Sequence, residues 1–137
     1  MTDVVVLRQK IHGLDPADYA DAIREHLPDA DVALARTPSE ERELLMEASV
    51  ATGFQIDPDV VAASDSLDLF VCTFAGTDHL PLDALEDAGV TVANASGVHG
   101  PNIAEHVLGW LLTLARSLDE GVRRQERREW RHFQAFG

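Results

Sequence analysis

Short β-branched runs alternate with helix-like patterns along the first two thirds of this chain, with short joints between them. The runs that read as strands are residues 3–7, 31–35, 49–52, 67–73 and 90–92. Helical patterns fill the gaps, at residues 16–27, 38–48, 58–63 and 81–87. Strands that alternate with helices are joined by right-handed parallel crossovers. The sequence therefore predicts an α/β fold with a flavodoxin-like five-stranded parallel sheet in the order 2-1-3-4-5.

Local signals support several of these elements. Thr37, Pro38 and Glu40 have the spacing of a capping box with proline at the first helical position. Asp57 followed by Pro58 repeats the cap-plus-proline signal. The run at 67–73 is the most hydrophobic, as expected for the centre of a parallel sheet. It contains the only cysteine of the chain, which we expect to be a small buried side chain.

The segment after the last predicted strand contains a helix that is apolar over much of its circumference. A loop rich in Gly, Ser, Asn and Pro leads into it. One apolar stripe consists of Ile103, Val107, Trp110, Leu111 and Leu114. A domain this small cannot easily surround such a helix, so the pattern indicates a partner outside the sequence.

The charge is unusually acidic. The formal net charge is −13 over 137 residues, which favours adaptation to high salt over an ordinary solvated surface. A nucleic acid or an anionic membrane is disfavoured as a partner. The arginine-rich stretch 119–136 contains interspersed acids and is interpreted as a structural segment. The sequence has neither a long apolar run nor a basic leader, so a cytoplasmic protein without a membrane span is expected.

Chemistry-bearing residues are sparse. No histidine has metal-ligand spacing with another ligand, so no metal site is predicted. His12, after the first strand, and His99, after the last, are candidates for the edge of a cleft. The sequence contains neither a G-x-G-x-x-G fingerprint nor a G-x-S-x-G elbow.

Ligands of open parallel sheets gather beyond the carboxyl ends of the strands. The loops predicted there are 53–54, 74–77 and 94–102. Gly76 would let the backbone approach a bound group, and successive N–H groups in such a turn can form an anion-binding nest. The alternative is an ordinary strand-to-helix turn in which Gly76 only permits a positive φ.

Several short motifs resemble those of the D-isomer-specific 2-hydroxyacid dehydrogenases. They are Asn94-x-x-Gly97, Asn102-Ile103-Ala104-Glu105-His106, Leu111-Leu112-x-x-Ala115-Arg116, Trp130 with Phe133, and the turn Phe74-Ala75-Gly76-Thr77-Asp78. The resemblance extends loosely over the whole chain. It implies a substrate-binding domain over residues 1–100, followed over residues 101–137 by an interdomain and dimerisation helix with a linker.

The resemblance also implies a function. The full-length enzyme would use NAD or NADP to reduce 2-keto acids to D-2-hydroxy acids. The substrate carboxylate would meet the main-chain amides of the loop after the fourth strand. The implied substrate-binding residues are Gly53, Phe54, Phe74, Ala75, Gly76 and Thr77, with the two phenylalanines as apolar walls. Asn102 would approach the nicotinamide end of the cofactor.

In the family, the nucleotide fingerprint and the catalytic Arg, Glu and His lie beyond the position where this sequence stops. The resemblance therefore places no catalytic residue in this chain and predicts that it is inactive alone. It also predicts a homodimer through the helical segment 101–133.

Two other classes of protein have the same predicted architecture. A corepressor-like or small-ligand-binding module has the same architecture and stays open as an alternative. A phosphoacceptor receiver domain is not supported, because acidic residues are absent from the ends of the first and third strands.

Overall fold

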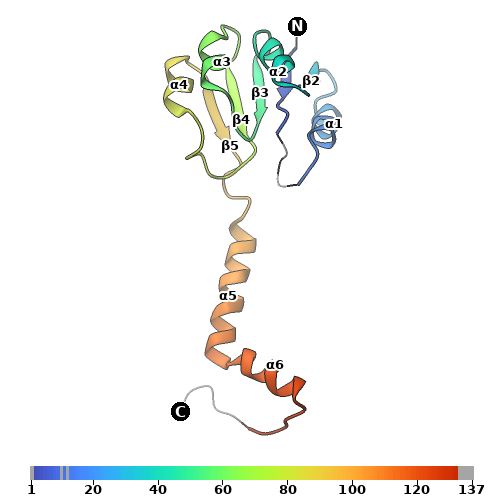
Figure 1. Ribbon diagram of the computed structural model, residues 1–137, viewed down its shortest axis with the longest axis vertical. Helices are drawn as coiled ribbons and strands as arrows, with labels where there is room; N and C mark the ends of the chain where they lie inside the picture. Colours follow the sequence, from blue (N-terminus) through green and yellow to red (C-terminus); the bar gives the residue numbers. More distant parts are fainter. Residues whose placement is uncertain (1, 10, 12, 133–137) are drawn as a thin grey trace. The chain divides into compact units, whose positions relative to one another are not determined.

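The computed structural model describes residues 2–9, 11 and 13–132 (Figure 1). The chain divides into two compact units, Met1–Ser96 and Gly97–Gly137. The first is an α/β unit and the second is helical. They are referred to below as the α/β unit and the helical unit.

The α/β unit contains a five-stranded sheet whose strands are all parallel. The strands are β1 (Val4–Val6), β2 (Val32–Leu34), β3 (Val50–Gly53), β4 (Leu69–Cys72) and β5 (Thr91–Asn94). They are ordered β2-β1-β3-β4-β5. The predicted fold class and strand order are confirmed. Three strands, β1, β2 and β4, are shorter than the predicted runs, because the flanking residues already turn into the neighbouring loops. β3 is shifted by one residue from its predicted run, and β5 extends beyond its predicted end to Asn94.

Four helices connect these strands. They are α1 (Pro16–His26), α2 (Pro38–Leu45), α3 (Pro58–Ala63) and α4 (Leu82–Asp87). The first three begin with proline directly after a side-chain cap, supplied by Asp15, Thr37 and Asp57. Proline has no N–H to satisfy, and the cap oxygen accepts one of the free N–H groups of the first turn.

The predicted capping box of α2 forms only in part. Thr37 Oγ1 accepts from the Glu40 N–H at 3.2 Å, as predicted. The Glu40 carboxylate, however, accepts from the N–H of Arg36, one residue before the cap, at 2.8 Å. The helix also ends before residue 48, where the sequence predicted its end. The hydroxyls of Ser64 and Ser66 donate to carbonyls at the end of α2, those of Leu45 and Met46, and so satisfy groups that another helical turn would have used.

The two faces of the sheet are covered unequally. Alternate residues such as Val5 and Leu7 pack, fully buried, in a large core with residues of α2, α3 and α4. On the opposite face, Val4 and Val6 pack against α1. That helix contributes Tyr19 and Ile23 to the smaller cluster, whereas Leu27, which follows its last residue, is exposed.

The smaller cluster does not extend to β4 and β5. On the α1 side of these strands, Leu69 and Val71 are half-buried, and Thr91 and Ala93 are exposed. Parallel sheets are ordinarily covered on both faces. Within the α/β unit, part of one face of this sheet is therefore uncovered.

The helical unit consists of α5 (Gly100–Arg116) and α6 (Leu118–Glu126). The predicted apolar helix is present as α5, but it does not run on to residue 133. Ser117 adopts a left-handed conformation with φ 50° and separates the two helices. No residue of either helix is buried. No helix among the described residues is long and apolar enough to cross a membrane.

Candidate functional site

The predicted substrate-binding residues lie where β3 and β4 end. Gly53 is the last residue of β3 and is paired with Cys72, the last residue of β4. Phe54 follows the first of these strands, and residues 74–77 follow the second. Because the two strands are parallel neighbours, their loops meet at one edge of the sheet. This is the edge at which open parallel sheets bind ligands.

The exit of β5 holds two carbonyl groups of the loop after β4. The Ala95 N–H donates to the Phe74 carbonyl at 3.2 Å, and Asn94 Nδ2 donates to the Ala75 carbonyl at 2.6 Å. Within the part of the chain that the structure describes, no hydrogen bond occupies the N–H groups of Ala75 and Gly76. The loop therefore has its acceptors satisfied and two successive donors available.

An aromatic cluster lies beside this loop. The rings of Phe54 and Phe74 are 4.6 Å apart between centroids, tilted by 59°. His79 stacks on Phe54 at 4.2 Å with an interplanar angle of 13°, and its Nε2 lies 2.7 Å from the Phe54 carbonyl oxygen. Both phenylalanines are half-buried, which agrees with the predicted role of apolar walls without testing it.

His79 is the member of this cluster that the sequence did not single out. The residues proposed for a cleft edge were His12, which lies outside the described residues, and His99, which lies in the helical unit. His79 follows the loop in a polar turn and contacts a residue 25 positions earlier. No local pattern ties two such positions together, so only the folded chain could reveal the contact.

The two glycines among the predicted binding residues, Gly53 and Gly76, have different surroundings. A Cβ on Gly53 would lie 2.8 Å from Leu7 Cβ, so this position is small because the core is packed against it. A Cβ on Gly76 would meet nothing within 4 Å. Gly76 is also absent from the residues with positive φ, so the interpretation of Gly76 as a residue that only permits a positive φ is wrong. Open space remains beside its backbone.

Thr77 and Cys72 complete the surroundings of the loop. Thr77 is half-buried, and its carbonyl accepts from the N–H of Leu80 in a tight turn. Cys72 is buried, as predicted, with its Sγ 3.7 Å from the Phe54 carbonyl oxygen and 3.9 Å from His79 Nε2. The thiol thus forms part of the floor beneath the aromatic cluster.

Unsatisfied polar atoms occur along the same edge of the sheet. Thr73 Oγ1, directly after β4, and Gln9 Oε1, shortly after β1, are buried without a hydrogen-bond partner among the described residues. Buried polar atoms are nearly always hydrogen-bonded. Water or a bound polar group is therefore expected at each.

The predicted cofactor-binding residue belongs to the helical unit. Asn102 is exposed in the first turn of α5. It lines a hollow of about 290 Å³ together with His99, Ile103, His106 and Val107. In the same helix, Trp110 Nε1 donates to His106 Nε2 at 2.6 Å.

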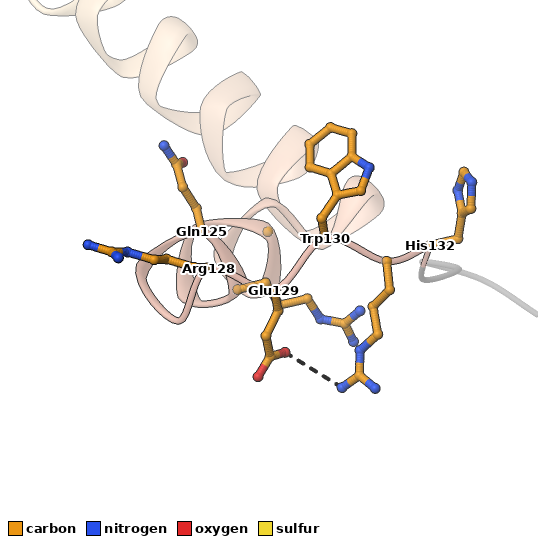
Figure 2. A pocket seen from close by; sticks show the side chains of 8 residues that line it. Gln125, Arg128, Glu129, Trp130 and His132 are labelled. Atoms are coloured by element: carbon orange, nitrogen blue, oxygen red, sulfur yellow. Dashed lines mark ion pairs between the residues drawn. The ribbon is translucent and has the colours of Figure 1, made fainter.

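A larger cavity, about 1080 Å³, lies elsewhere in the helical unit (Figure 2). Its basic lining is partly neutralised: Arg124 pairs with Glu120 at 2.6 Å, and Arg131 with Glu129 at 3.6 Å, the pair dashed in Figure 2. The hydrogen bond from Arg124, followed by its charge and those of neighbouring arginines, lowers the pKa of Glu120. Two of the arginines that line this cavity, Arg124 and Arg131, are therefore engaged in ion pairs.

No group of three or more potential metal ligands occurs among the residues that the structure describes. The arrangement at the strand ends offers main-chain donors, apolar walls and a histidine. It can hold a small anion with an apolar substituent.

Comparison with known proteins places this chain in a family. The profile of the family described as D-isomer specific 2-hydroxyacid dehydrogenase, catalytic domain, matches residues 12–130. The chain is 37% identical to an erythronate-4-phosphate dehydrogenase of Pseudomonas fluorescens over 90 residues, 66% of the chain and 22% of that protein. It is 28% identical to a D-3-phosphoglycerate dehydrogenase of Methanocaldococcus jannaschii over 126 residues, 88% of the chain and 24% of that protein.

A solved structure has the same fold. A D-lactate dehydrogenase of Aquifex aeolicus, complexed with NAD and lactic acid, superposes with a TM-score of 0.66 at 18% identity, covering 96% of this chain and 39% of that one. The chain thus spans about a quarter of the two curated relatives and well under half of the solved protein.

Proposed function

The chain belongs to the D-isomer specific 2-hydroxyacid dehydrogenase family, and we propose that it is the substrate-binding part of an NAD(P)-dependent enzyme that reduces 2-keto acids to D-2-hydroxy acids. The ligand-binding edge of the α/β unit would hold the keto acid. Its carboxylate would accept from the N–H groups of Ala75 and Gly76, and its substituent would lie against Phe54 and Phe74.

One observation carries this proposal. The N–H groups of Ala75 and Gly76 are successive, lie in the loop that follows β4 and have no partner among the described residues. Successive main-chain donors of this kind form concave anion-binding sites. The open space beside Gly76 leaves room for the anion to reach them.

The cofactor fits this chain only in part. No G-x-G-x-x-G occurs in the sequence, so the residues present do not supply the usual dinucleotide-binding turn. In the proposal, NAD or NADP is bound mainly by a further domain of a longer protein, and Asn102 approaches the nicotinamide end. Residues 101–137 would then contain the connection to that domain.

The open face of the sheet supports the same view. Leu69, Val71 and Ala93 line the part of the sheet face that α1 does not cover. Relatives several times longer than this chain have further polypeptide that could cover it. We therefore place this face inside the longer protein.

The helical unit supports a proposed homodimer. Six large apolar side chains of α5 are exposed by 57–68% of their surface: Ile103, Leu108, Trp110, Leu111, Leu112 and Leu114. An exposed apolar patch of this kind ordinarily marks an interaction surface. We propose that α5 and α6 form the subunit interface, within residues 101–133.

A cytoplasmic location and adaptation to high salt complete the proposal. The net charge of −13 supports the second, because salt screens repulsion among surface carboxylates. Unfolding in increasing KCl tests it, since the protein should gain stability up to molar salt. Stability that is independent of salt would contradict this adaptation.

Binding tests the substrate site directly. The ¹⁵N-labelled 137-residue chain is titrated with pyruvate while the backbone amide resonances are followed. We expect saturable shifts at Ala75 and Gly76. Pyruvamide, which has the same shape without the carboxylate charge, serves as the matched control and should shift them far less. Equal responses to both compounds would contradict carboxylate recognition.

An activity assay tests whether hydride transfer requires the further domain. The purified chain with NADH and pyruvate should show no NADH oxidation above background, because the hydride-transfer site would require the further domain. Turnover by the 137-residue chain, at a rate that follows its concentration, would overturn this part of the proposal. Sedimentation velocity at micromolar concentration tests the dimer, which a strictly monomeric chain would exclude.

A further inference from the structure

Asn94 links the exit of one strand to the binding loop of the next. It is the last residue of β5, and its Nδ2 donates to the Ala75 carbonyl at 2.6 Å. Its side chain is exposed, so packing alone does not confine it to this position. We propose that Asn94 is a positioning residue that orients the main-chain donors of the loop toward the substrate carboxylate. This inference rests on the proposed function.

The geometry follows from the planarity of the peptide bond. In a trans peptide the C=O of one residue and the N–H of the next point in opposite directions, and the described chain has no cis peptide. Asn94 draws the Ala75 carbonyl toward β5, so the Gly76 N–H must point away from β5. The Ala95 N–H draws the Phe74 carbonyl in the same direction, which turns the Ala75 N–H away as well.

The result differs from an ordinary strand. Along a strand, successive carbonyls point to opposite sides, and so do successive N–H groups. Here two successive carbonyls are held by neighbouring residues of one segment, Asn94 and Ala95. The two N–H groups are thereby brought to the same side, which is the arrangement that an anion-binding nest requires.

Of these two bonds, only one depends on a side chain. The Ala95 bond is made by the backbone and does not depend on which side chain follows β5. The Asn94 bond needs an amide donor of this length. An aspartate in its place would have no donor at neutral pH and would add a second negative charge near the ligand. The two changes Asn94→Ala and Asn94→Asp therefore separate the lost bond from the added repulsion.

The test is a pyruvate titration of the ¹⁵N-labelled 137-residue chain in four forms: wild type, Asn94→Ala, Asn94→Asp and Ser96→Ala. Ser96 is exposed in the segment that follows β5 and serves as the control. We expect roughly tenfold weaker binding for Asn94→Ala, the effect of one lost hydrogen bond. Asn94→Asp should bind more weakly still, and Ser96→Ala like the wild type.

A second readout separates positioning from folding. Without ligand, Asn94→Ala should move the Gly76 amide resonance and leave those of the core residues Val5 and Phe70 unchanged. A merely structural role would instead move the core resonances or lower the stability of the unit. A partial return of affinity in Asn94→Gln, which retains an amide donor, would support the positioning role further.

The outcomes distinguish the two proposals. If wild type shifts at Ala75 and Gly76 and Asn94→Ala binds equally well, the positioning role is overturned and the proposed function stands. If wild type shows no saturable shift at these amides, the proposed function fails and the positioning role fails with it. Weaker binding in both Asn94 variants, with an unchanged core, supports both.

Discussion

The two units of this chain use apolar residues in opposite ways. In the α/β unit, large side chains such as Phe70, Leu45 and Leu85 are almost fully buried in one core. In the helical unit, α5 is more apolar than α6, yet none of its side chains is buried. The first unit uses its hydrophobic residues for its own core, whereas the second leaves them exposed. Apolar composition therefore does not reveal whether a helix is buried.

Truncation of a large apolar side chain should affect the unfolding free energy very differently in the two units. Phe70→Ala should lower the unfolding free energy by about 3–5 kcal/mol, because a buried aromatic leaves a cavity. Leu111→Ala, at a side chain 57% exposed, should change it by less than about 0.5 kcal/mol. Chemical denaturation followed by circular dichroism measures both. A comparable loss for Leu111 in dilute monomer would show that α5 is part of the stable fold.

Within the α/β unit, substitution of Gly53 and of Gly76 should have opposite effects on stability. Gly53→Ala should destabilise it by about 1–3 kcal/mol, because the new methyl group overlaps Leu7 in a packed core. Gly76→Ala should be neutral or stabilising by up to about 1 kcal/mol, since the backbone there is unstrained and an alanine restricts the unfolded chain.

Pyruvate binding should respond differently from stability, with Gly76→Ala expected to impair binding. Gly76→Ala places a methyl group beside the proposed carboxylate-binding amides and should weaken pyruvate binding although the protein is intact. Thermal unfolding and amide titration of the same samples measure the two effects. If Gly76→Ala binds pyruvate as the wild type does, the open space is not the ligand site.

A helix cap should have a smaller effect. Thr37→Ala removes the bond from its hydroxyl to the Glu40 N–H at the start of α2 and should cost about 1 kcal/mol. Thr37→Ser keeps the oxygen and should retain most of that stability. Equal unfolding midpoints for Thr37→Ala and wild type would show that the Glu40 carboxylate, bonded to the Arg36 N–H, holds this end alone.

The ion pairs of α6 should contribute least and depend on pH. The folded pKa of Glu120 lies below its usual value near 4.5, mainly through the Arg124 hydrogen bond. The contribution is therefore fully present above that usual value and is lost as pH falls through the lowered folded pKa. The helical signal of the wild type should decline there slightly more than that of Glu120→Gln. Salt should diminish the difference, because the pair is exposed. Identical acid titrations of the two proteins would remove this role.

Periodicity and local signals predicted most of the fold. Alternating strand and helix patterns indicated the sheet, and proline after a cap residue marked the starts of α2 and α3. The end of α2 was predicted too late because its carbonyls are satisfied by Ser64 and Ser66. These serines lie in a later loop, so their contacts with the end of α2 cannot be predicted from a local pattern.

The candidate site divides in the same way. The loop at 74–77 could be located from its place after a strand and from the family resemblance. The roles of Asn94 and His79 could not, because each contacts a residue many positions away, Ala75 and Phe54 respectively. The reason for each glycine was equally hidden: only the packed chain distinguishes Gly53, pressed against Leu7, from Gly76, beside open space.

By itself, then, the sequence determined the number and order of the strands, the starts of the helices, the family and an apolar helix too exposed for its own unit. These depend on properties of neighbouring residues: backbone preference, periodicity and capping. The tertiary structure alone decided which carbonyls of the loop at 74–77 accept hydrogen bonds and which of its N–H groups have no partner among the described residues. That outcome depends on hydrogen bonds between segments that meet only when the parallel strands are paired, so it has no counterpart in any local stretch of the chain.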